Sequence, residues 1–118
     1  MYSPTVLDHY RHPRNVGEIP NATAAVEATN PVCGDLLKLW VSVRDGRIVD
    51  ARFKVEGCIP AIACASWLTE RVLGKSPAEL GGVGPAEIEA AMGGLPSASR
   101  HAAALAANGL QQLLGKIA

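Results

Sequence analysis

Two cysteines, an aspartate and a histidine are the side chains of this chain best suited to metal binding or sulfur chemistry. Cys33 and Asp35 lie in "NPVCGDLL", between a proline turn and an apolar run, whereas Cys58 follows Gly57 and His101 precedes an alanine-rich stretch. Thiolate, imidazole and carboxylate groups are all ligands of zinc or iron in proteins. A cysteine can equally be a small core residue or a nucleophile, so the elements that position these residues must decide between the three uses.

The elements around Cys33 and Cys58 are predicted to be strands. Residues 36–43 and 48–55 alternate apolar and polar side chains, and Asp45-Gly46 between them is a strong hairpin signal. Residues 22–29 form a weaker third strand. On the last strand of the hairpin, one face is expected to carry Val49, Ala51, Phe53 and Val55.

Helices are expected before and after these strands. Ser3-Pro4 indicates a helix that runs to about Arg11, and Pro60 opens a helix that runs to about Leu73 and is closed by Gly74. Shorter helices should start at Ser76 and at Gly84-Pro85, and a last helix near Ser97 or Ser99. Its apolar stripe is Ala102, Leu105, Ala106, Leu110, Leu113, Leu114 and Ile117. The order predicts one α+β domain over residues 1–118, a three-stranded antiparallel sheet with helices on one face.

This order brings the chemically active residues together. Cys33 and Asp35 fall in the turn before the first hairpin strand, and Cys58 falls in the turn after the second, so all three should meet at one end of the sheet. His101 lies in the first turn of the last helix. Glycine beside each cysteine relieves crowding, as backbone next to a metal requires. Cys33, Asp35, Cys58 and His101 therefore form a four-ligand set for zinc, or part of a set for an iron–sulfur cluster.

Composition excludes several other classes of function. The chain has 118 residues, 48% of them hydrophobic, and 11 basic residues balance 11 acidic ones. With no block of like charge, we expect no nucleic-acid partner and no anionic membrane surface. The first residues lack an apolar signal core and no stretch is long enough to span a membrane, so a cytoplasmic protein with reduced thiols is expected.

The chain resembles the U-type iron–sulfur cluster assembly scaffolds, the family of IscU and of the N-terminal domain of NifU. The resemblance covers almost the whole chain. It is carried by four blocks: "YSPTVLDHYRHPRNVG" at 2–17, "CGD" with "LKL" at 33–39, "DARFKVEGCIPAIACAS" at 50–66, and, less fully, "LPSASRHAAALA" at 95–106.

The resemblance implies a carrier rather than an enzyme. By this resemblance Cys33, Asp35, Cys58 and His101 hold a transient [2Fe–2S] cluster or a zinc ion. The chain departs from the family at Ala102, where the family has its third cysteine. Cys64, one turn inside a predicted helix, is interpreted as a packing residue and not as the replacement thiol. His9 and His12 are interpreted as structural residues of the amphipathic first helix. Trp40 and Trp67 are interpreted as packing or interface residues, and Trp40 is expected to lie on the sheet face opposite Leu39 and Val41, where a partner could contact it.

Three functions remain open from the sequence. The first is a scaffold that receives sulfur and iron and passes a cluster to apo iron–sulfur proteins; the partners implied by the resemblance are a cysteine desulfurase and an Hsp70-type chaperone with its co-chaperone. The second is a zinc-dependent persulfide acceptor. The third is a degenerate paralogue that regulates a cysteine desulfurase.

Overall fold

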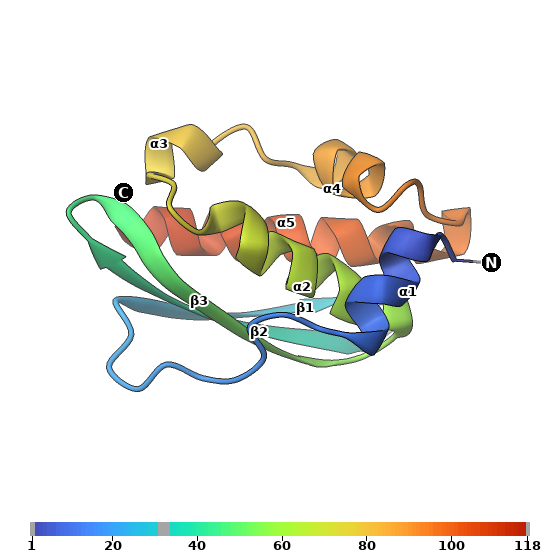
Figure 1. The fold of residues 1–118 in the computed structure, drawn as a ribbon, viewed down its shortest axis with the longest axis horizontal. Coiled ribbons are helices and arrows are strands. Elements are labelled where there is room, and N and C mark those ends of the chain that lie inside the picture. Colours follow the sequence, from blue (N-terminus) through green and yellow to red (C-terminus); the bar gives the residue numbers. More distant parts are fainter. Residues whose placement is uncertain (1, 31–33, 118) are drawn as a thin grey trace.

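A computed structural model describes residues 2–30 and 34–117. A sheet of three antiparallel strands in the order β1-β2-β3 has the helices packed against one of its faces (Figure 1). The predicted α+β fold is therefore confirmed. The elements are α1 Pro4–Arg11, β1 Ala24–Asn30, β2 Asp35–Arg44, β3 Arg47–Glu56, α2 Ile59–Val72, α3 Pro77–Leu80, α4 Pro85–Ala91, a short 3-10 helix η1 Ser97–Ser99, and α5 Arg100–Ile117.

The predicted helix boundaries agree with the structure to within about two residues, and side-chain caps hold the starts of α1 and α3. The Ser3 hydroxyl accepts a hydrogen bond from the Val6 amide at the start of α1, and Ser76 forms a capping box with Glu79 at the start of α3. Gly74 ends α2 with φ +79°.

The hairpin of β2 and β3 contains a bulge that the sequence pattern did not reveal. Asp45 and Gly46 have φ of 53° and 75°, as a tight hairpin turn requires. Next to this turn the register shifts, so that Val43 faces Ile48 while Ser42 faces Asp50. The prediction that Val49 points to the core is therefore wrong. Ile48 is buried instead, and Val49 is 51% exposed.

Helices α2 and α5 form the layer over the sheet (Figure 1), and their apolar side chains close the core. The predicted stripe of α5 is buried apart from Ile117, which is half-buried. Near its centre α5 comes so close to the sheet that a Cβ at Gly109 would lie 2.9 Å from the Leu39 side chain. This close packing fixes where the first turn of α5 lies relative to β1 and β2.

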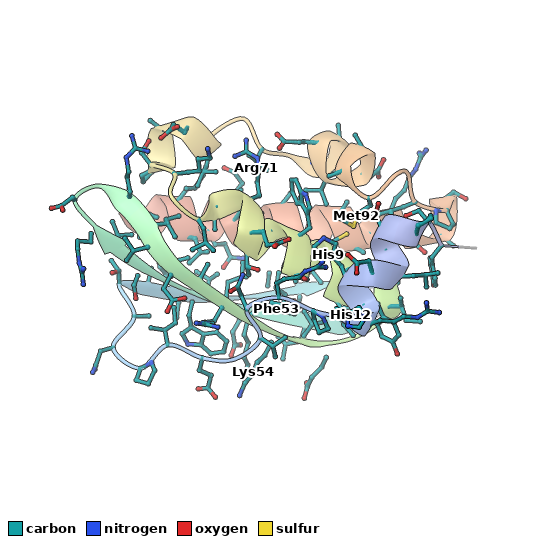
Figure 2. The ribbon with its side chains drawn as sticks, in the orientation of Figure 1. His9, His12, Phe53, Lys54, Arg71 and Met92 are labelled. Carbon is teal, nitrogen blue, oxygen red and sulfur yellow. The ribbon has the colours of Figure 1, made fainter. Side chains whose placement is uncertain are left out.

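Helix α1 is held on α2 by a buried polar contact. His9 is only 6% exposed, and its Nδ1 lies 2.8 Å from the Ser66 hydroxyl, which also accepts a hydrogen bond from the Arg14 amide. Figure 2 shows His9 on the side of α1 that faces α2, whereas His12 is exposed. The structural interpretation agrees with the burial of His9, whereas the exposed His12 is not part of the core. Burial lowers the pKa of His9 below 6.5, and the positive charge of Arg14 adds to the effect.

We predict that the free energy of unfolding falls as the pH drops from about 7.5 to about 5.5. The unfolded chain binds a proton at His9 near its ordinary pKa of 6.5, while the folded chain binds it only at lower pH. The stability is therefore complete above the unfolded pKa and is lost as the pH falls through it. Urea unfolding at several pH values measures this dependence. His9→Asn, which retains a group able to bond Ser66, should flatten it, whereas His12→Asn should not; equal slopes in His9→Asn and the parent would contradict the assignment.

Candidate metal centre

Asp35 lies inside a strand and not in the preceding turn, where the sequence had placed it. It is the first residue of β2 and shares the inward face of that strand with Leu37 and Leu39. Asp35 is only 5% exposed. Asp35 is therefore not a solvated turn residue, and its carboxylate lies at the edge of the core.

Cys58 is the N-cap residue of α2, and only Gly57 separates it from the end of β3. Its backbone is extended, with φ −76° and ψ 167°, and its half-buried side chain makes no capping hydrogen bond to the helix. The thiol lies at the positive end of the α2 dipole, and two of its partners, Asp35 and His101, belong to other elements.

His101 belongs to α5, the second helix of the layer that covers the sheet. It is the second residue of α5, and its side chain is 28% exposed. Beside it lies a surface hollow of about 320 Å³, which is also lined by Thr29, Asn30, Ala104, Leu105 and Asn108. The imidazole is therefore reached from the surface even though the carboxylate behind it is buried.

The structure brings these three side chains together at one end of the sheet. The Cys58 thiol donates to Asp35 Oδ2 at 3.2 Å, and His101 Nε2 lies 3.7 Å from Cys58 Sγ and 3.5 Å from Asp35 Oδ2. In a tetrahedral zinc site, bond lengths of ~2.0–2.3 Å place ligand atoms roughly 3.3–3.8 Å apart. Two of the three separations lie in this range and the third, between Cys58 Sγ and Asp35 Oδ2, is only slightly shorter, so these atoms could bind one ion with little movement.

The charges of the cluster also favour a cation. As a neutral thiol, Cys58 can donate to the Asp35 carboxylate, but as a thiolate it would place a second negative charge 3.2 Å away in a partly buried site. Two like charges at this distance repel each other, and a cation between them removes the repulsion.

Two glycines permit this arrangement for different reasons. A Cβ on Gly57 would lie 2.6 Å from Asp35 Oδ1 and 3.0 Å from Asp35 Cβ, so only glycine leaves room for the carboxylate. Gly34 instead has φ +74° with open space around it. The sequence suggested that both glycines make room near a metal. The structure shows that Gly57 makes room for Asp35, whereas Gly34 supplies a backbone conformation.

The sequence also singles out Cys33, Cys64 and Ala102. Cys33, which the sequence places in the ligand set with Asp35, Cys58 and His101, lies outside the described residues. Cys64 is fully buried in the core, and burial raises the pKa of its thiol to about 12, in agreement with a packing role. Ala102 is 1% exposed, so a larger side chain there would need space inside the protein.

In the described part of the chain, no helix combines the length and the apolar character that crossing a membrane requires.

Comparisons with known proteins place the chain in a family. A family model described as the NifU-like N-terminal domain matches residues 1–117. The iron–sulfur cluster assembly scaffold proteins IscU 1 and IscU 2 of Archaeoglobus fulgidus are each 41% identical over 114 residues, which cover 97% of this chain and 74% of theirs. The scaffold protein IscU of Escherichia coli K12 is 51% identical over 79 residues, which cover 64% of this chain and 62% of its own.

A solved structure agrees at the level of the fold. The N-terminal part of a nitrogen-fixing NifU-like protein from Brucella abortus superposes with a TM-score of 0.79 at 18% identity, covering 98% of this chain and 92% of that one. The relatives are named as scaffolds, which confirms the prediction of a carrier and not an enzyme. With a family model matched along nearly its whole length and a relative 41% identical over 114 residues, the chain belongs to the NifU-like N-terminal domain family of iron–sulfur cluster scaffolds.

Proposed function

We propose that this chain acts, as one domain over residues 1–118, as an iron–sulfur cluster assembly scaffold. The observation that carries the proposal is the cluster of Asp35, Cys58 and His101, whose ligand atoms lie within 4.8 Å of one another in a chain of this family. The cargo is iron, or a nascent [2Fe–2S] cluster, bound by these three residues together with Cys33, which precedes Asp35 by two positions in the sequence.

The composition of this set suits transfer better than storage. Iron–sulfur clusters are usually held by cysteine thiolates, so a carboxylate and an imidazole replace part of the usual set. A hard carboxylate oxygen is a weaker ligand for a cluster iron than a thiolate. The cluster would therefore leave toward a recipient with more thiolates, and the surface hollow beside His101 gives such a recipient access.

The proposed function implies protein partners of three kinds. A cysteine desulfurase would supply sulfur, an Hsp70-type chaperone with its co-chaperone would assist release, and apo iron–sulfur proteins would receive the product. These reactions belong to the cytoplasm, where thiols stay reduced.

A second candidate is a zinc-dependent persulfide acceptor. The spacing of the three ligand atoms favours it, because it matches a single tetrahedral ion. In that function Cys58 would accept sulfur while zinc stabilises its thiolate, and no cluster would form.

Anaerobic reconstitution with ferrous iron, cysteine and a catalytic amount of desulfurase separates these functions. A scaffold should develop the visible absorption of a [2Fe–2S] cluster, whereas a persulfide acceptor should gain sulfane sulfur without iron, and a purely regulatory paralogue should gain neither.

The same reconstitution separates the roles of the two described cysteines. Cys58→Ala should abolish cluster formation. Cys64→Ser should retain it and lower the stability by about 1–3 kcal/mol through an unpaired buried hydroxyl. Equal loss of the cluster in both variants would assign Cys64 to the site.

Ala102→Cys is predicted to slow the loss of the cluster several-fold. The first turn of α5 already brings His101 to the site, and a thiolate is a stronger cluster ligand than an imidazole. Since Ala102 is buried, overpacking should cost about 1–3 kcal/mol of stability. The decay of cluster absorbance against a chelator gives the rate, and Ala103→Cys, equally buried on the same helix, is the matched control. Identical decay in both variants would mean that position 102 does not reach the cluster.

Gly57→Ala should weaken metal binding at least roughly tenfold, which corresponds to ~1.4 kcal/mol. The new methyl group would overlap the Asp35 side chain and push its carboxylate away from Cys58 and His101. Titration with Co²⁺, followed by the thiolate charge-transfer band, measures the affinity. Gly115→Ala in α5 is the control, because a Cβ there meets nothing within 4 Å. Equal affinity in both variants would show that the Asp35 carboxylate does not contribute to the site.

A further inference from the structure

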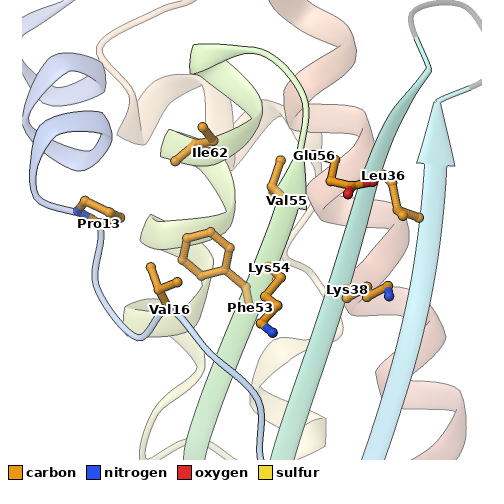
Figure 3. A pocket seen from close by; sticks show the side chains of 9 residues that line it. All are labelled: Pro13, Val16, Leu36, Lys38, Phe53, Lys54, Val55, Glu56 and Ile62. Carbon is orange, nitrogen blue, oxygen red and sulfur yellow. The ribbon is translucent and has the colours of Figure 1, made fainter.

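The outer edge of β3 is covered by the chain's own backbone. The Phe53 amide bonds the Asn15 carbonyl at 3.0 Å, and Figure 3 shows Val16 beside the Phe53 ring on this edge. Nearer the hairpin turn, the Ile48 amide bonds the Lys75 carbonyl at 2.9 Å. Main-chain groups that an edge strand leaves open to other chains are therefore satisfied here at two places.

The outer edge of β1, the other edge strand of the sheet, is open next to the candidate metal centre. The Ala25 carbonyl faces away from β2, because it accepts a hydrogen bond of 3.0 Å from Lys116 Nζ. Main-chain groups of an antiparallel strand alternate between its two sides, so those of Glu27 and Thr29 face the same way. β1 pairs with β2 alone, and among residues 2–30 and 34–117 no group bonds Glu27 or Thr29 on the outward side.

Helix α5 packs on β1 and gives this open edge a second wall. Ala104, Asn108 and Gln112 are exposed and follow one another at intervals of four, so they share one side of the helix. Asn108 and Thr29 line the same surface hollow of about 320 Å³. Gln112 and Glu27 line a second hollow of about 360 Å³. We call the space between these three residues of α5 and these two residues of β1 the edge groove.

The edge groove leads to the candidate metal centre. At its far end, Lys116 already occupies the Ala25 carbonyl. At its near end, His101 lines the same hollow as Thr29. Because His101 Nε2 lies 3.7 Å from Cys58 Sγ, a chain lying in the edge groove would end beside the groups proposed to bind the cargo.

The groups along the edge groove match those of an extended polypeptide. Glu27 and Thr29 each present an outward amide and an outward carbonyl, and an added β-strand satisfies both kinds of group. Asn108 and Gln112 carry side-chain amides that both donate and accept, so they can bond the other side of an added strand. The occupant that this chemistry specifies is an extended segment of another protein.

We propose that the edge groove binds the cysteine-bearing ligand segment of an apo iron–sulfur protein as an added strand on β1. This inference rests on the proposed scaffold function. Without its cluster, such a segment is not held in a folded site, so its main-chain groups are free to pair. Pairing with Glu27 and Thr29 brings its cysteine to the hollow beside His101. There an Fe–S bond to the incoming thiolate forms as the Fe–N bond to the imidazole breaks, with no change of oxidation state.

Amide hydrogen exchange of the cluster-free chain tests the contact directly. The probe is a reduced synthetic peptide that copies a cysteine-containing ligand segment of a [2Fe–2S] ferredoxin. It should slow exchange of the Glu27 and Thr29 amides at least roughly tenfold, because they would pass from solvent into a strand ladder. The Gly17 amide, already bonded to Phe53 on the opposite edge, is the internal control and should not change. Unchanged exchange at Glu27 and Thr29 in millimolar peptide would refute the proposal.

Proline substitutions test the consequence for transfer. Glu27→Pro removes an outward amide of an edge strand and keeps the bonds to β2. After reconstitution it should transfer its cluster to apo [2Fe–2S] ferredoxin roughly tenfold more slowly at subsaturating ferredoxin, followed by the circular dichroism of the holo-ferredoxin. Ala25→Pro makes the same change on the same strand, where Lys116 already covers the edge, and should transfer at the parent rate. Both variants should load the same amount of cluster and lose it to a small chelator at the same rate.

A second pair of variants keeps the test decisive if Glu27→Pro does not fold. Asn108→Ala removes a side-chain amide of the edge groove and should slow transfer several-fold. Gln111→Ala makes a similar change at an exposed position of α5 outside the edge groove and should leave transfer unchanged. Equal rates for these two variants would contradict the proposed contact with α5.

Other outcomes overturn the proposal in distinguishable ways. Equal transfer in the two proline variants would remove the edge groove from transfer while leaving the scaffold function intact. Slower sulfur uptake from the desulfurase with unchanged transfer would assign the edge groove to the donor. Self-association of the parent that Glu27→Pro abolishes would assign it to a second copy of this chain. Failure of the parent protein to form any cluster would refute the scaffold function itself, whereas hydrogen exchange would still report on the edge groove.

Discussion

The antiparallel pairing of β2 with β3 is the constraint on which the rest of the candidate site depends. In this register Leu36 faces Glu56, so the residues that follow β3 return alongside Asp35. A slip of one residue would turn the Asp35 side chain to the opposite face of the sheet, away from α5. The bulge near Ser42 and Val43 lies at the far end of the hairpin, and it leaves the register at the Asp35 end undisturbed.

The site combines groups that would repel one another if both were negatively charged with no cation between them. A buried carboxylate lies 3.2 Å from a thiol at a helix N-terminus, and Gly57 has no side chain that would keep them apart. Such a cluster of potential negative charges is unfavourable for stability, but it creates affinity for a cation. The mixed sulfur, oxygen and nitrogen donors then keep that affinity moderate, which is what a carrier needs if its cargo must leave.

The N-terminal segment packs on α2 and on the edge of β3, the two elements that flank Cys58. Ser66 holds both His9 of α1 and the backbone of Arg14, and Asn15 donates to Thr69 on the same helix. These contacts position residues 15–17 on the outer edge of β3, where they satisfy backbone groups that an edge strand would otherwise leave open. The same contacts build one wall of an apolar groove along the hairpin, where Val16 lies beside Phe53 (Figure 3).

The sequence by itself determined the elements and the identity of the reactive residues. Alternation, caps and the Asp-Gly turn are local signals, and they predicted the three strands, the helices around them and the meeting of Asp35 and Cys58 at one end of a hairpin. Only the tertiary structure decided the rest. The bulge that exposes Val49 in place of Ile48, the burial of Asp35 and the contact between Gly57 and Asp35 all depend on how separate strands and helices pack. Alternation and caps register only neighbours along the chain, whereas these features arise between residues that are distant in sequence and close in space.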